Sequence, residues 1–197
     1  MIIRINKNMR GFIDKNEKEK VPAIQYLAES AAHYFDAEKA GLVADFMSFL
    51  KENNLNPRRK NINVWTINYK GRMIASIEYY ENEWWIGPAT GFYKKEYIQE
   101  RKDWKELYNE CITNDEMKEL IRKGLSIEPF CPGYYECKKR GENGGELFGK
   151  YYEGICGCGH IRIKNPTKEE FETTKKLILL LMDIRNDITA LEKELKK

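Results

Sequence analysis

Long apolar runs are what this chain most clearly lacks. Its longest uninterrupted apolar run covers residues 177–182, which is far shorter than the roughly 20 residues that a membrane-spanning helix needs. The first residues of the chain become charged before the apolar core of a signal peptide could form. We therefore expect a protein of the cytoplasm, without a membrane partner.

A large excess of charge of one sign is also missing. The chain has 34 Lys and Arg and 31 Asp and Glu, a net charge of +3. The most basic local run is Arg58-Arg59-Lys60, and three charges after a proline are typical of a solvated turn. Because no basic stripe continues along a face, we predict that the protein has no nucleic-acid partner.

Recognisable catalytic motifs are absent as well. The chain has two histidines, His33 and His160, and contains no phosphate-binding glycine loop, dinucleotide fingerprint, nucleophile elbow or HExxH motif. Asp and Glu are plentiful, but no spacing pairs two of them for acid–base chemistry. We interpret the protein as non-enzymatic, although an active site assembled from distant residues stays open.

Helical signals occur in both halves of the chain. Pro22 and Asp36 each precede an apolar pattern of helical spacing, and Asp36 is expected to cap its helix. A short helix follows Asn114, with Gly124 predicted as its C-cap. Thr167 begins a capping box, which predicts a long C-terminal helix.

The middle of the chain has strand patterns. Residues 62–80 alternate as two strands around a turn at Lys70-Gly71, and a third strand follows a second turn. The pattern predicts the α+β class, with an antiparallel β-meander packed against helices. The length suits a single domain over residues 1–197, with an irregular cysteine-rich segment at 128–165.

That segment holds four of the five cysteines and one histidine, namely Cys131, Cys137, Cys156, Cys158 and His160. Thiolate and imidazole are the ligands that zinc prefers in tetrahedral sites. We hypothesise that the four cysteines hold a structural zinc ion and that His160 can substitute for one of them. The spacing differs from that of a zinc finger, so inert thiols in a packed segment and a thiol-redox enzyme stay open as alternatives.

A family resemblance concerns the same part of the chain. The stretch from Gly145 to Cys156 contains Leu-Phe-Gly-Lys-Tyr-Tyr, and Arg-Ile-Lys-Asn-Pro and a helix follow it. This arrangement resembles the C-terminal half of an uncharacterised bacterial family of the low-GC Gram-positive type, over about the last third of the chain. The resemblance implies that Cys131, Cys137 and Cys156 belong together, and it implies no activity.

One face of the predicted sheet is aromatic. A two-residue turn at Lys70-Gly71 would pair Trp65 with Ser76 and place Glu78 and Tyr80 on the same face. Trp85 joins them if the next turn also has two central residues, whereas a three-residue loop would place Trp84 there instead. A carboxylate ringed by aromatic side chains suits a planar or cationic small molecule. In its chemistry alone, such a carboxylate among aromatic rings resembles the multidrug-binding domains of the gyrase-inhibitor-like type. The alternative is an ordinary, half-exposed sheet face.

The C-terminal helix carries a heptad seam, formed by Leu177, Leu181, Ile184, Ile188, Leu191 and Leu195. Such a seam can pair with a second copy of the chain and give a homodimer. The alternative, which the apolar early part of the helix favours, is that the seam lies along its own domain.

Overall fold

The computed structural model describes residues 22–61, 64–80, 83–89, 104–125, 145–152 and 161–194. The helices in these ranges are α2 (Ala23–Tyr34), α3 (Ala37–Glu52), α4 (Trp104–Cys111), α5 (Asp115–Leu125) and α6 (Lys168–Glu194). The strands are β1 (Pro57–Asn61), β2 (Val64–Tyr69), β3 (Arg72–Tyr80), β4 (Glu83–Pro88), β5 (Gly145–Leu147), β6 (Lys150–Tyr152) and β7 (Ile163–Lys164).

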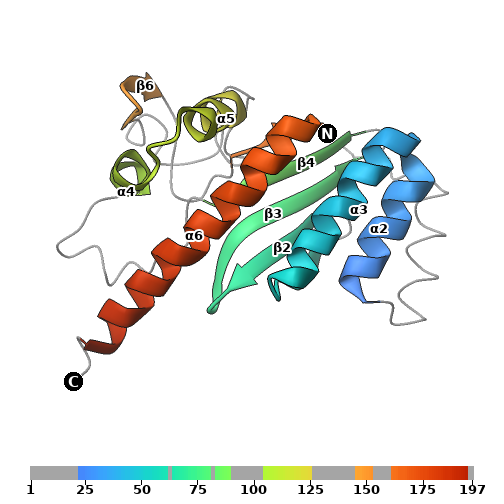
Figure 1. Ribbon diagram of the computed structural model, residues 1–197, viewed down its shortest axis with the longest axis horizontal. Helices are drawn as coiled ribbons and strands as arrows, with labels where there is room; N and C mark the ends of the chain where they lie inside the picture. Colours follow the sequence, from blue (N-terminus) through green and yellow to red (C-terminus); the bar gives the residue numbers. More distant parts are fainter. Residues whose placement is uncertain are drawn as a thin grey trace.

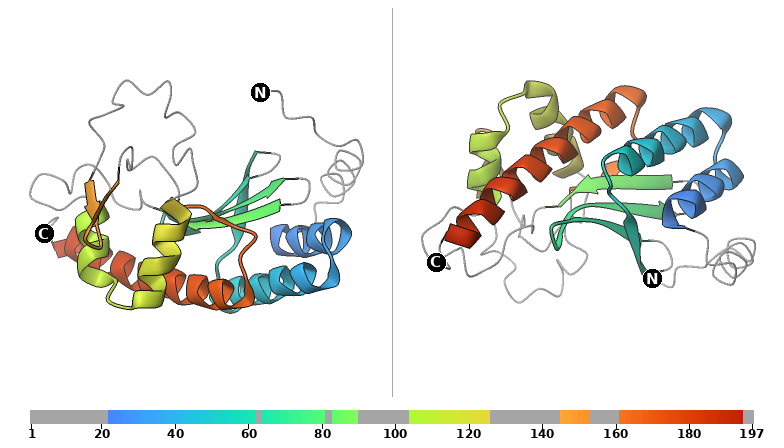
Figure 2. Two further views of the ribbon diagram at one scale, coloured as in Figure 1. Left: turned by 90° about the horizontal axis from the view of Figure 1, so that it is seen from above. Right: turned by 60° about the horizontal axis from the view of Figure 1, so that its bottom comes forward.

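Five of the strands form one antiparallel sheet, in the order β1-β2-β3-β4-β7, and β5 pairs with β6 in a separate hairpin. Helices α2, α3 and α6 form a layer on one face of the sheet (Figure 2). Helix α6 lies between α3 on one side and the group formed by α4, α5 and the small hairpin on the other (Figure 1). The predicted α+β class, with a long C-terminal helix, is confirmed.

The predicted helix starts are confirmed in detail. The Asp36 carboxylate accepts a hydrogen bond of 2.9 Å from the backbone N–H of Lys39, and Asn114 caps α5 in the same way. Thr167 Oγ1 accepts from the N–H of Glu170, and a Glu170 oxygen accepts from the N–H of Thr167, at 3.3 and 2.9 Å. These reciprocal bonds satisfy N–H groups that a helix leaves open at its start.

The core between the sheet and the helices is built on aromatic side chains. The Trp84 ring is fully buried and stacks on Phe171 of α6, with 4.5 Å between ring centroids. Tyr79 lies next to Trp84, and its hydroxyl donates a hydrogen bond of 3.2 Å to the Leu27 carbonyl of α2. Burial raises the pKa of Tyr79, so the phenol remains protonated and remains a donor.

The predicted pairing of β2 with β3 is right at the turn and wrong beyond it. Tyr69 pairs with Arg72, but the register shifts between Ile67 and Asn68, so Trp65 pairs with Ile77 instead of Ser76. A shift of one residue moves the side chains of the strand to the opposite face. Trp65 therefore lies on the helix-covered face, 2% exposed, against the rings of Tyr26 and Tyr79.

The basic run that we predicted as a turn forms the edge strand β1. Pro57 begins the strand, where a missing N–H is tolerated. The Arg59 guanidinium lies 6.0 Å from the centroids of both the Tyr26 and the Trp65 rings. Charged side chains along an edge strand also hinder pairing with the edge of another sheet.

The heptad seam of α6 packs on its own domain over its first half. Leu177 and Leu181 are fully buried and Ile184 is 6% exposed, whereas Ile188 is half-buried. The side chains of Leu191 and Leu195 lie outside the part that the structure describes. Among the described helices, none is both long enough and apolar enough to span a membrane.

Candidate functional site

The five predicted metal ligands lie outside the described residues; they are Cys131, Cys137, Cys156, Cys158 and His160. Within the described ranges, no three His, Cys, Asp or Glu side chains gather in a way that could hold a metal ion. The remaining cysteine, Cys111 of α4, is half-buried against the core. What the structure does describe is the framework at the ends of the cysteine-rich segment.

The first part of this framework joins α5 to the residues that precede β7. The backbone N–H of Arg162 donates to the carbonyl of Gly124, 3.4 Å away. Ile161 is fully buried here, against two glycines. A Cβ at Gly87 would lie 1.6 Å from the Ile161 carbonyl oxygen, and a Cβ at Gly124 would lie 2.4 Å from Ile161 Cγ2. Gly124, predicted as a C-cap, is therefore a helical residue that permits a close approach.

The second part is the β5–β6 hairpin, which is fixed to α4 and α5. The N–H of Phe148 donates to Asn109 Oδ1 of α4 at 2.7 Å, and Arg122 Nη2 of α5 donates to the Phe148 carbonyl at 2.9 Å. Phe148 adopts a φ of 52°, which is strained for an aromatic residue, and the following Gly149 has a φ of 75°. These contacts hold the Phe148-Gly149 turn in place.

Two segments of the chain, which we call connectors, therefore share the same two end points, which we call fixed points. One fixed point is the contact of Gly124 with Arg162, and the other is the strand pair of Gly145 with Tyr152. The first connector is residues 126–144 and the second is residues 153–160. The second has eight residues, so the two fixed points lie within roughly 30 Å of each other at full extension of the chain.

The second candidate site lies on the face of the sheet opposite helices α2, α3 and α6 (Figure 2). Tyr80 pairs with Glu83, which confirms the two-residue turn, and Glu78 is directly opposite Trp85. Arg162 Nε lies 3.5 Å from Glu78 Oε1, and the two side chains are only 18% and 6% exposed. The Arg162 guanidinium is also 5.9 Å from the centroid of the Trp85 ring.

The four residues predicted for this site do not all come together. Glu78 and Trp85 do, but Trp65 is on the opposite face, and the Tyr80 side chain lies outside the described part of the chain. Sequence reasoning missed two basic residues of this site, Arg162 and Lys164. The Nζ atom of Lys164 lies 5.6 Å from the centroid of the Trp85 ring. Arg162 directly precedes β7 and Lys164 lies in it. Their spacing of two was the available signal, because alternate residues of an extended chain share a face.

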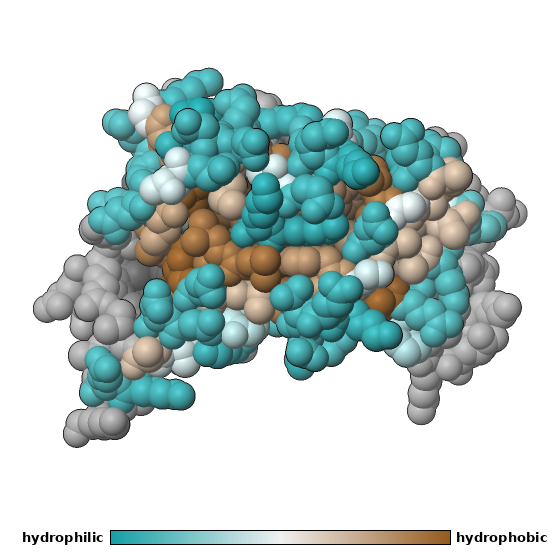
Figure 3. Space-filling view, in the orientation of Figure 1, coloured by the Kyte–Doolittle hydropathy of each residue, from teal (hydrophilic) through white to brown (hydrophobic). Residues whose placement is uncertain are grey.

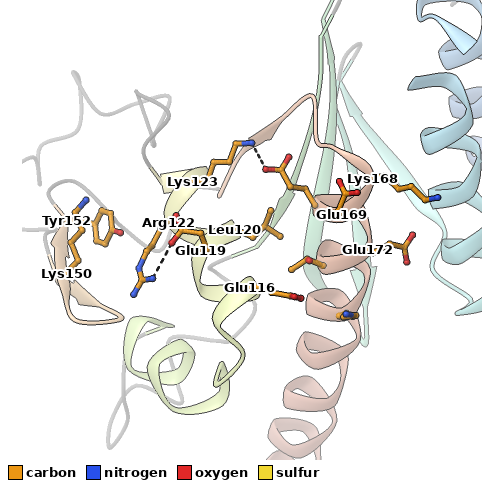
Figure 4. A pocket seen from close by; sticks show the side chains of 13 residues that line it. Glu116, Glu119, Leu120, Arg122, Lys123, Lys150, Tyr152, Lys168, Glu169 and Glu172 are labelled. Atoms are coloured by element: carbon orange, nitrogen blue, oxygen red, sulfur yellow. Dashed lines mark hydrogen bonds and ion pairs between the residues drawn. The ribbon is translucent and has the colours of Figure 1, made fainter. Parts of the chain in front are cut away.

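A third feature is an open cleft of about 990 Å³ between α5, β6 and the start of α6 (Figure 4). Its charged lining consists of Glu116, Glu119, Glu169, Glu170, Glu172, Arg122, Lys123, Lys150, Lys168 and Lys176. Lys123 pairs with Glu170, and Arg122 pairs with Glu119 at 3.4 Å. Burial raises the pKa of Tyr152 at one end. Charges of both signs are interspersed here, so the lining does not indicate one class of ligand.

Comparison with models of protein families, with curated proteins and with solved structures finds no match for this chain.

Proposed function

We propose that this is a non-enzymatic cytoplasmic protein in which a structural zinc ion organises residues 126–160. The proposed ligands are Cys131, Cys137, Cys156 and Cys158, with His160 as a substitute. Four thiolates close the coordination sphere of zinc, so such a site stabilises structure and does not activate water. A reducing compartment such as the cytoplasm keeps these thiols available for the metal.

The observation that carries the proposal is the pair of fixed points that bracket the cysteines. Cys131 and Cys137 belong to the connector of residues 126–144, and Cys156 and Cys158 belong to the connector of residues 153–160. Because both connectors share their end points, the chain allows each of them to bring two thiols to a common site. This topology permits a four-thiolate site despite a sequence spacing unlike that of a zinc finger.

The size of the β5–β6 hairpin supports the same proposal. Each strand has three residues, and a two-stranded hairpin is marginally stable in water at best. Contacts with Asn109 and Arg122 fix its turn. A zinc ion near its open end would fix the other end, because the free energy of metal binding adds to the free energy of folding.

Elemental analysis of untagged protein purified without chelator is expected to find one zinc ion per chain. Cys156→Ser should reduce the bound zinc and lower the melting temperature sharply, because it removes one of four ligands. Cys111→Ser is the matched control, since Cys111 is on α4 and outside the proposed ligand set. Metal-free wild-type protein, or a Cys156→Ser variant with unchanged zinc content and melting temperature, would contradict the proposal.

A second candidate function is the binding of a planar, cationic small molecule beside Trp85. The observation that favours it is the Glu78–Arg162 ion pair, which lies almost buried next to a half-exposed indole ring. The protein itself brings a guanidinium close to both a carboxylate and an aromatic ring. A ligand with an amidinium or guanidinium group could therefore take the place of Arg162, since it would meet the same charge and the same ring.

Titration with aromatic amidines, followed by tryptophan fluorescence, is expected to give a saturable change in the wild-type protein. Trp85→Phe should abolish most of this change, because the reporting ring is lost. Trp65→Phe is the control, since Trp65 lies on the opposite face of the sheet. The candidate function fails if the wild type does not respond, or if the two variants lose the response equally.

A further inference from the structure

The outer face of α6 carries an apolar surface at the middle of the helix. Leu179 is 39% exposed there, and among the described residues only it and Tyr151 are large hydrophobic side chains that are exposed. Met182, three residues further and half-buried, is its neighbour on the helix. Figure 3 shows this apolar surface over the middle of α6 and between α6 and α3. No described element covers the outer side of this helical layer (Figure 2).

Two exposed charges of opposite sign flank Leu179. Lys176 precedes it by three residues and Asp183 follows it by four, and both side chains are exposed. Within the part of the chain that the structure describes, neither of them takes part in an ion pair, whereas nearby Lys175 pairs with Glu172 at 2.7 Å. Lys176, Leu179 and Asp183 therefore form a stripe along the helix that is positive at its start, apolar in its middle and negative at its end.

We infer that this face binds a second copy of the chain, with the two α6 helices antiparallel around a two-fold axis next to Leu179. In an antiparallel pair centred there, Lys176 of each copy faces Asp183 of the other, and the two Leu179 side chains meet on the axis. A two-fold interface requires a surface that complements itself. The stripe meets that requirement, because in an antiparallel pair the positive end of each copy faces the negative end of the other.

The neighbouring charges are compatible with this arrangement. The next exposed acids on the stripe, Glu172 and Asp187, would face each other across the axis, and the ion pair of Glu172 with Lys175 reduces the repulsion between them. Helix α6 has 27 residues, so it offers about 40 Å of contact length. The interface differs from the heptad seam, whose residues Leu177 and Leu181 are buried in their own domain.

Sedimentation velocity over a range of protein concentrations tests the inference. The wild type is expected to dimerise, and Lys176→Asp and Asp183→Lys should each weaken dimerisation by roughly tenfold, because each turns two attractive pairs into two repulsive ones. The double variant, with both changes, should restore dimerisation to near the wild-type level. Glu38→Lys changes the charge as much as Asp183→Lys does, at an exposed site on α3, and should leave dimerisation unchanged.

Three outcomes would overturn the inference. The first is a wild-type protein that stays monomeric up to roughly 200 μM, a concentration at which even a weak dimer is populated. The second is a dimer that neither single reversal weakens more than Glu38→Lys does. The third is a double variant that dimerises no better than the single ones. Both substituted positions are exposed, so the melting temperatures of all variants should stay close to that of the wild type.

Discussion

Replacing Gly87 by alanine is expected to lower the free energy of unfolding by about 3 kcal/mol, because the new methyl group overpacks a closed site. A Cβ at this position would lie 1.6 Å from the carbonyl oxygen of Ile161 and 2.9 Å from its carbonyl carbon. Both atoms belong to the backbone, so no rotation of a side chain can relieve the clash. Either β4 or the chain at Ile161 has to move.

Denaturation by urea measures this effect, and Gly41→Ala is its control. Gly41 lies in α3 and has no atom within 4 Å of an added Cβ. Alanine there should stabilise the protein by up to about 1 kcal/mol, because glycine is the poorer helix former. If the Gly87→Ala variant were as stable as the wild type, that result would contradict the close approach of the Ile161 backbone to Gly87 of β4 described above.

The same substitution bears on the zinc proposal. Ile161 directly follows the connector that carries Cys156 and Cys158, and its position depends on two glycines far away in the sequence. If the fixed point between Gly124 and Arg162 helps to bring the cysteines together, Gly87→Ala should also weaken zinc binding. Gly41→Ala should leave zinc binding unchanged.

The helices could be predicted from the sequence because their signals are local. Asp36 and Thr167 are each three residues before the N–H group whose hydrogen bond they accept. The apolar spacing that follows each of them identifies the buried side of the helix. Gly124 shows the limit of such rules. A glycine near the end of a helix is usually a C-cap, but here contacts with Ile161 and Arg162, distant in sequence, explain its presence.

The sheet face could be predicted only in part. The turn at Lys70-Gly71 predicted the correct partner for Tyr69, whereas the length of the second turn was left open. The register shift after Ile67 has no marker in the sequence and moves Trp65 to the other face. Arg162 was missed because it directly precedes β7, a strand that joins the sheet from far along the chain. Its charge matters only once β4 and β7 are paired and Glu78 lies within reach.

The Glu78–Arg162 pair provides the second large expected effect. Glu78→Leu should destabilise the protein by about 3 kcal/mol, because it leaves the Arg162 guanidinium poorly solvated without its carboxylate. Arg162→Met should cost a similar amount, since it removes the cation next to a carboxylate that is only 6% exposed. The double variant Glu78→Leu/Arg162→Met should lie within about 1 kcal/mol of the wild type, because apolar side chains of similar volume often replace a buried ion pair at little cost.

Urea denaturation of all four proteins forms a double-mutant cycle, which isolates the coupling between the two side chains. A coupling close to zero would show that the pair contributes nothing in its buried setting. The stable double variant then serves a second purpose. It keeps Trp85 but lacks the carboxylate that an amidine needs, so it should no longer bind aromatic amidines. A double variant that is fully folded and still binds them would assign the binding to another part of the molecule, and would leave the ion pair a purely structural role.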